Sequence, residues 1–209
     1  MNNEIKTINS MLMLLKSDAV NFFFDLEDTI LAENIFYSAL SQQYFTQILM
    51  NLITKYSFID IKKLISYGKN HHREILDPNT THVFNTLDSN GKNQMALTSG
   101  FLSIHKVHRL FDHGIFFKHI IFTRKIDKGP IIVEFIKKYN IQGKCAFIDN
   151  DLHKVENVRE HYELFSNEPI DLYVYHKTYN KKVTKEDFIN YWTDTIKSFI
   201  KKYKKILND

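Results

Sequence analysis

Two acidic residues each follow directly on an apolar run, at points far apart in the sequence. The stretch FFF leads into Asp25, and the stretch AFI leads into Asp149. If both runs are strands of one parallel sheet, their carboxyl ends meet at the edge where such sheets bind ligands. Two carboxylates held close together repel each other unless a cation lies between them. Carboxylate oxygens suit magnesium, so the sequence predicts Mg²⁺ as a cofactor beside Asp25 and Asp149.

Hydroxyl and ammonium groups occupy two further positions expected at this edge. Thr98 and Ser99 follow the apolar stretch MAL, and their hydroxyls suit a phosphate oxygen. Lys128 comes just before an apolar helix, where its ammonium and the free backbone N–H groups both favour an anion. Taken singly, Lys128 is equally well explained as a surface lysine, whereas ordinary turn residues are the less favoured explanation for the two acids. The chain order acid, hydroxyl, lysine, acid predicts a site for phosphate chemistry.

Five short apolar runs predict the strands that position these residues. Most are continuous rather than alternating, which is typical of strands covered on both faces in a parallel sheet. The runs are residues 20–24, 94–98, 119–122, 145–148 and 171–175. Apolar residues at helical spacing lie between the second and fourth runs and begin again after the fourth. This alternation predicts a right-handed, doubly wound α/β fold.

Two other helical regions complete the expected organisation. Residues 32–93 carry apolar residues at helical spacing and end in turn-rich sequence, which predicts a small helical insertion acting as a cap. Residues 185–207 predict one long amphipathic helix with a lysine-rich face. The length of 209 residues favours a single domain over 1–209. The last helix runs almost to the end of the sequence, as in a piece of a longer protein.

The order of these groups resembles the haloacid dehalogenase (HAD) superfamily over most of the chain. The first motif of that family reads Asp-x-Asp-x-Thr after an apolar strand. DLEDT matches it at Asp25 and Thr29, with Glu27 in place of the second aspartate. Thr98 matches the hydroxyl residue of the second motif, and Lys128 matches the lysine of the third.

The acidic fourth motif of the family is matched by IDND. Asp149 takes its first acidic position, Asn150 stands where a second acid often occurs, and Asp151 is a substitute for it. The resemblance implies a HAD-like doubly wound (Rossmannoid) parallel sheet of about five strands, with a small helical insertion after the first strand. It also implies that the first strand lies between the second and the fourth.

The resemblance further implies a chemical role for each residue. Asp25 is expected to attack phosphorus and form an aspartyl-phosphate. Glu27 is expected to protonate the leaving oxygen and later activate water. The residues expected to bind the phosphoryl group are Thr98, Ser99 and Lys128. The expected metal ligands are Asp25, Glu27 through its backbone carbonyl, Asp149 and Asn150.

Glu27 is the main departure from the family pattern. Its carboxylate lies one C–C bond, about 1.5 Å, further out than that of an aspartate. A misplacement of about 1 Å can cost on the order of a hundredfold in rate, so slow turnover is expected unless the backbone compensates. Glu27 and Asn150 also leave open a HAD-fold binding module without turnover. Transfer of the phosphoryl group to an acceptor other than water is a third interpretation.

The expected substrate depends on whether the sequence has enough residues for a cap domain over the site. Residues 99–118 are too few for a cap domain, and the insertion over 32–93 is small. In the superfamily that the sequence resembles, open sites tend to accompany large substrates. A phosphorylated protein, with phosphotyrosine as the first choice, is therefore expected, and a small phosphate ester is the alternative. The composition and the motif variant also resemble HAD-like phosphatases that intracellular bacteria deliver into host cells.

The composition also indicates where in the cell the protein is expected and which other partners it is expected to bind. The one cysteine, Cys145, excludes an internal disulfide and suits a reducing compartment. With no signal peptide and no apolar run of about 18 residues, a soluble cytoplasmic protein is expected.

The net charge of +4 is concentrated in residues 176–209, which contain nine lysines and four acidic residues. These lysines suggest contact with an anionic membrane, although a solvated helix face is the simpler explanation. Nucleic acid is not expected as a partner, since no RNA-binding signature is present.

Two other candidates for chemistry are weaker. His105 and His108 lie three residues apart on an expected helix, but no acid or cysteine completes a set of metal ligands at a recognisable spacing. Cys145 lacks the nearby arginine that a cysteine phosphatase loop needs, which favours a buried packing residue.

Overall fold

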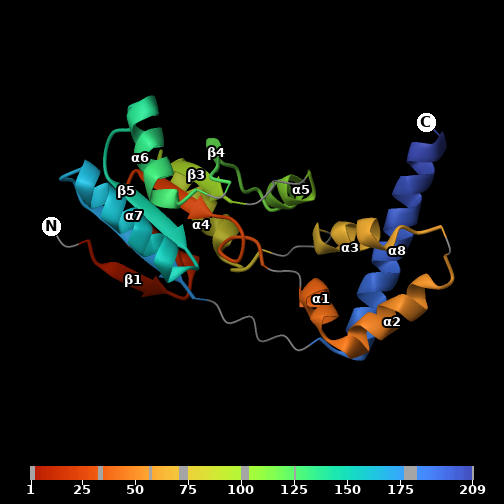
Figure 1. Ribbon diagram of the computed structural model, residues 1–209. Helices are drawn as coiled ribbons and strands as arrows, with labels where there is room; N and C mark the ends of the chain where they lie inside the picture. Colours follow the sequence, from red (N-terminus) through yellow and green to blue (C-terminus); the bar gives the residue numbers. More distant parts are fainter. Residues whose placement is uncertain are drawn as a thin grey trace. The chain divides into compact units, whose positions relative to one another are not determined.

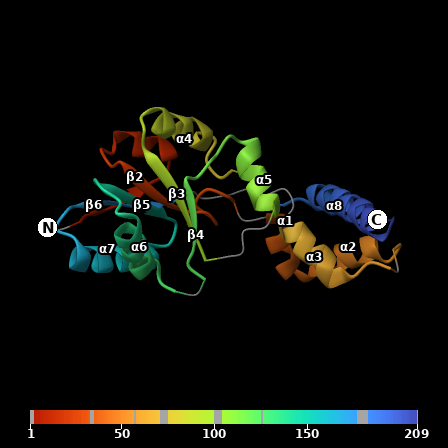
Figure 2. The same ribbon diagram turned by 90° about the horizontal axis from the view of Figure 1, so that it is seen from above.

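The chain forms two compact units, Met1–Ala32 with Ile75–Thr178 (unit 1) and Glu33–Glu74 with Tyr179–Asp209 (unit 2). The structure is a computed structural model. Figures 1 and 2 show unit 1 as a sheet covered by helices, and unit 2 as helices alone. The structure describes residues 3–32, 35–56, 58–70, 75–99, 104–124, 126–176 and 183–208.

A six-stranded sheet in which every pair of neighbours runs parallel is the centre of unit 1. Its order is β1-β6-β5-β2-β3-β4, so β2 lies between β3 and β5, as the family resemblance implied. The predicted doubly wound α/β fold is confirmed. The strands are β1 (Ile5–Ile8), β2 (Asn21–Asp25), β3 (Asn93–Thr98), β4 (His119–Phe122), β5 (Cys145–Asp149) and β6 (Ile170–Tyr175).

The sheet has one strand more than the five runs predicted. Strand β1 pairs with β6 at the edge of the sheet, and of its four residues only Ile8 is buried. The segment therefore lacks the continuous apolar run that marks strands covered on both faces.

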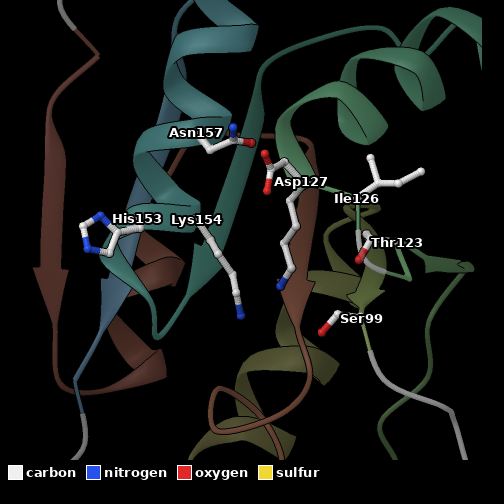
Figure 3. A pocket seen from close by; sticks show the side chains of 8 residues that line it. Ser99, Thr123, Ile126, Asp127, His153, Lys154 and Asn157 are labelled. Atoms are coloured by element: carbon white, nitrogen blue, oxygen red, sulfur yellow. The ribbon is translucent and has the colours of Figure 1, made fainter.

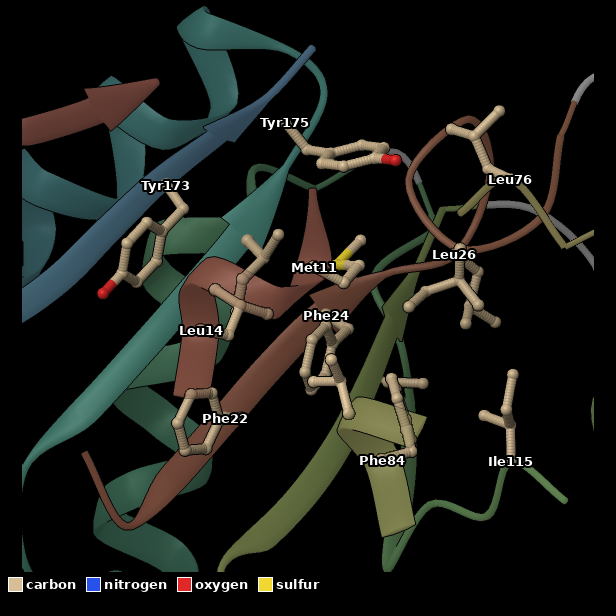
Figure 4. Close-up of a cluster of buried hydrophobic side chains, with 14 of the residues drawn as sticks. Met11, Leu14, Phe22, Phe24, Leu26, Leu76, Phe84, Ile115, Tyr173 and Tyr175 are labelled. Carbon is tan, nitrogen blue, oxygen red and sulfur yellow. The ribbon is translucent and has the colours of Figure 1, made fainter. Parts of the chain in front are cut away.

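Helices cover both faces of this sheet. Helices α6 (Lys128–Tyr139) and α7 (Leu152–Phe165) lie on one face, and the 3-10 helix η1 (Met11–Lys16) and α4 (Thr80–Ser89) lie on the other (Figure 2). Successive side chains of β2 point to opposite faces. Phe23 packs in the cluster with α6 and α7, whereas its two neighbours pack in the cluster with η1 and α4 (Figure 4). Burial on both faces explains the unbroken aromatic run before Asp25.

Unit 2 is helical and contains the last helix of the chain. Its core includes Leu49, Leu64 and Trp192, the last of which is fully buried. Sequence patterns assigned residues 32–93 to the insertion, but α4 packs on the sheet of unit 1, which leaves residues 33–74 in unit 2. None of the described helices is long and apolar enough to cross a membrane. The elements are α1 (Ile35–Ser38), η2 (Ala39–Ser41), α2 (Gln43–Ile53), α3 (Ile61–Asn70) and α8 (Lys185–Asn208).

Candidate active site

The carboxyl ends of β2 and β5 bring Asp25 and Asp149 together in unit 1. Phe24 pairs with Ile148, which sets the two strand ends side by side. Lys128, the first residue of α6, bridges the acids. Its Nζ donates a hydrogen bond to Asp25 Oδ1 and another, of 2.7 Å, to Asp149 Oδ2. None of the three residues is more than 3% exposed, so the charges are compensated within the protein.

Burial alters the protonation of this cluster. Burial first, and then the negative charge of Asp149, raise the pKa of Asp25 to about 7 against the opposing effect of Lys128. Burial alone would lower the pKa of Lys128, but its interactions with the two acids outweigh burial and raise that pKa above its usual value. A carboxyl group that titrates near neutral pH beside a fixed cation is typical of a functional site.

A tight loop after β2 returns Thr29 to Asp25. Two backbone N–H groups of the loop donate to the carbonyl of Leu26, and Asp28 adopts a left-handed φ of 60°. The buried Thr29 hydroxyl lies 3.3 Å from Asp25 Oδ2 and accepts a hydrogen bond of 3.0 Å from the backbone N–H of Asn150. Thr29 therefore joins the loops that follow β2 and β5.

Glu27 contacts a second group of residues. Its Oε2 accepts a hydrogen bond of 2.9 Å from Thr98 Oγ1, and its Oε1 forms an ion pair with Lys106 Nζ. Burial alone would raise the pKa of Glu27, but the hydrogen bond and charge of Lys106, with the hydrogen bond from Thr98, hold it below its usual value. The hydroxyl of Thr98, predicted to bind phosphate, thus contacts the predicted acid and base.

Lys106 also belongs to the site, although it is not among the residues predicted from the sequence motifs. It belongs to α5 (Ile104–Asp112) and is only 5% exposed. Helical spacing was the available signal, because Lys106 lies four residues before the buried Leu110 and so shares its face. His108, on the same helix, is exposed, and the side chain of His105 lies outside the described residues.

A cavity of about 130 Å³ lies beside the bridging lysine (Figure 3). Ser99 is exposed and its hydroxyl points into this space, as does the ammonium end of Lys154. The positive charge of Lys154 also acts to lower the pKa of Asp25. The cavity therefore offers hydroxyl and ammonium groups to an anion. It is lined by Ser99, Thr123, Ile126, Asp127, Lys128, His153, Lys154 and Asn157.

The oxygen atoms at this edge of the sheet fit magnesium. Asp25 and Asp149 supply carboxylates, Asn150 supplies an amide oxygen, and Mg²⁺ in proteins commonly takes one or two carboxylates with water and phosphate. Within the described ranges, no three His, Cys, Asp or Glu residues gather as a metal-binding group. Asp151, which the motif offers as an alternative to Asn150, caps α7 and accepts a hydrogen bond of 3.0 Å from the backbone N–H of His153.

Cys145 lies at the opposite end of its strand from Asp149. It is buried, and burial raises the pKa of its thiol to about 11. Such a thiol stays protonated at neutral pH and is a poor nucleophile, which suits a packing residue.

Sequence comparisons give no family for this chain, since no protein-family model and no curated protein matches it. Among solved structures, it is similar to one titled "The crystal structure of a hydrolase from Streptococcus pneumoniae TIGR4", with 11% identity and a TM-score of 0.49. The similarity covers 78% of this chain and 96% of the other. A likeness at this level establishes neither a family nor an activity.

Proposed function

We propose that this protein is a magnesium-dependent phosphatase of the HAD type that works through an aspartyl-phosphate. One observation carries the proposal. Lys128 bridges two buried carboxylates, Asp25 and Asp149, at the carboxyl ends of adjacent parallel strands. Such an arrangement costs folding free energy and is more usual at sites that bind charged reactants than in cores.

Asp25 supplies the nucleophile. One of its carboxylate oxygens forms a bond to phosphorus while the bond from phosphorus to the leaving oxygen breaks. Water then attacks phosphorus, which releases inorganic phosphate and regenerates the Asp25 carboxylate. Asp25, Asp149 and Asn150 would hold Mg²⁺, which would supply positive charge that offsets the charge of the phosphoryl group.

The remaining residues bind the phosphoryl group or transfer protons. Lys128 and Ser99 face the cavity and donate to phosphoryl oxygens. Glu27, whose carboxylate reaches solvent, takes up a proton from water, gives it to the leaving oxygen and later takes one from the attacking water. Because the Thr98 hydroxyl donates to Glu27, Thr98 orients this residue, and Ser99 takes the phosphate contact.

The proposed substrate is a phosphorylated protein, with phosphotyrosine as the first choice. The cavity of about 130 Å³ has room for a phosphoryl group but is smaller than the roughly 300–1,000 Å³ of pockets that enclose small-molecule ligands. Most of a substrate would therefore lie outside it. Comparing kcat/KM for a phosphotyrosine peptide with that for free phosphotyrosine tests this choice, and a preference for the free amino acid favours a small phosphate ester instead.

Hydrolysis of 4-nitrophenyl phosphate with and without Mg²⁺ tests the proposed activity. Asp25→Asn is expected to lower kcat by on the order of a thousandfold or more. Asp88→Asn, at an exposed aspartate of α4, is the matched control and should behave as wild type. Equal activity of wild type and Asp25→Asn would remove the enzyme interpretation.

A HAD-fold binding module is the second candidate. It is favoured by the contacts of Glu27, because both carboxylate oxygens are engaged by protein donors. Calorimetric binding of inorganic phosphate with Mg²⁺, by a wild-type protein that hydrolyses no phosphate ester, would support it. Delivery into a host cell and contact of the α8 lysines with anionic membranes stay predictions from the sequence.

A further inference from the structure

The buried lysine of α5 is the feature that the mechanism above leaves unexplained. Lysine is almost never fully buried unless its charge is paired. Lys106 is 5% exposed and is ion-paired with Glu27, a residue 79 positions earlier in the sequence. A helix outside the four family motifs thus places a cation on the predicted acid and base.

Each oxygen of Glu27 has a different donor from a different element. Thr98, at the end of β3, donates to Oε2 at 2.9 Å, and Lys106, on α5, contacts Oε1. The side chain of Glu27 keeps 25% exposure, so its carboxylate is held at two points and still reaches solvent. Charge-assisted contacts of this kind are stronger and more directional than neutral hydrogen bonds.

We propose that Lys106 is a positioning residue that fixes Glu27 for proton transfer to the leaving oxygen. This inference rests on the proposed phosphatase function. A free glutamate side chain samples many rotamers, and holding it in one rotamer beforehand removes that entropic cost from the reaction. An acid must lie within hydrogen-bond reach of the atom that it protonates. The two donors prepare that geometry before substrate binds, and so offset the extra methylene of Glu27.

Aryl phosphates of similar shape separate this role from a merely structural one. The leaving group of phenyl phosphate is a weakly acidic phenol, whose oxygen needs a proton as it departs. The leaving group of 4-nitrophenyl phosphate, 4-nitrophenolate, departs readily without a proton. For Lys106→Met, kcat/KM for phenyl phosphate is expected to fall on the order of tenfold to a hundredfold, since a misplaced acid loses much of its effect. The fall for 4-nitrophenyl phosphate is expected to stay within about threefold.

Two further variants test whether Lys106 acts through its partner. Lys106→Arg keeps a cation that can donate to Glu27, so it should retain more of the kcat/KM for phenyl phosphate than Lys106→Met does. In a Glu27→Gln background, Lys106→Met should cause little further loss, because residues that act as one unit are not additive. Lys138→Met, at an exposed lysine of α6, is the control and should behave as wild type.

The double variant also guards against misfolding, because it leaves no unpaired buried charge. If Lys106→Met does not fold, Glu27→Gln with Lys106→Met is compared with Glu27→Gln alone. Equal kcat/KM supports the proposal, and a further tenfold loss overturns it. An equal loss for both aryl phosphates in Lys106→Met, or none, also overturns it while leaving the phosphatase function intact. A wild type without Asp25-dependent hydrolysis would instead overturn the proposed function, and this inference with it.

Discussion

Asp25→Asn is expected to remove a pH-dependent loss of stability from the metal-free protein. Burial and the charge of Asp149 raise the pKa of Asp25 from 3.8 to about 7. Between these values the folded protein holds a proton on Asp25 that the unfolded chain has released. The folded state then binds more protons than the unfolded state, so its stability falls as pH rises through this window.

The size of the effect follows from the two pKa values. Each pKa unit corresponds to about 1.4 kcal/mol, so ionising Asp25 in the folded state costs on the order of 4 kcal/mol by pH 8. About 3 kcal/mol of this cost develops between pH 5 and pH 8. Asparagine carries no charge at either pH. The unfolding free energy of Asp25→Asn minus that of wild type should therefore rise by about 3 kcal/mol over this range.

Urea unfolding at pH 5 and pH 8, with a chelator to keep divalent cations away, measures this difference. Asp88→Asn is the control, because an exposed aspartate should leave the pH dependence of wild type unchanged. The same pH dependence in wild type and Asp25→Asn would refute the reasoning. It would mean that Asp25 is already ionised in the folded protein at pH 5, with Lys128 compensating its charge.

Three other substitutions test the packing and the site. Gly68→Ala should destabilise unit 2 by roughly 1–3 kcal/mol, because a Cβ there would lie 2.5 Å from the ring of Trp192; fluorescence of this single tryptophan during denaturant unfolding measures the change. Asp77→Ala should cost about 2–4 kcal/mol in thermal unfolding, because the buried Asp77 carboxylate accepts hydrogen bonds of 2.8 Å from the backbone N–H groups of Met11 and Asn79. Glu27→Asp should lower kcat/KM for phenyl phosphate by about tenfold, since the shorter side chain cannot reach both of its donors; an increase would show that the extra methylene is a defect.

Strands β2, β3, β5 and β6 could be predicted to within one residue because burial on both faces requires a nearly continuous apolar run in the sequence. A strand covered on both sides is mostly apolar, and in β2 and β5 the first charged residue marks the carboxyl end. That is why Asp25 and Asp149 could be placed at one edge. Strand β1 has no such mark, since only Ile8 of its four residues is buried.

The boundary of the insertion could not be predicted because helical periodicity shows which face is buried, not what covers it. The apolar stripe of α4 has the same spacing as those of α2 and α3, yet Val83, Phe84 and Leu87 pack against the sheet. For the same reason the role of Lys106 could not be predicted. Its helical spacing from Leu110 indicated that it lies on the buried face, but not that it forms an ion pair with Glu27 there.

Glu27 is better understood together with its two donors than as an aspartate of the motif that the sequence resembles, lengthened by one methylene. Its carboxylate lies where Thr98, from β3, and Lys106, from α5, each contact one oxygen. An aspartate would end about 1.5 Å short and could not keep both contacts without a shift of the backbone. Loss of this ion pair is expected to destabilise the fold, because Lys106 is almost fully buried. The longer acid and the buried lysine therefore depend on each other, and the departure from the family pattern belongs to the pair rather than to one position.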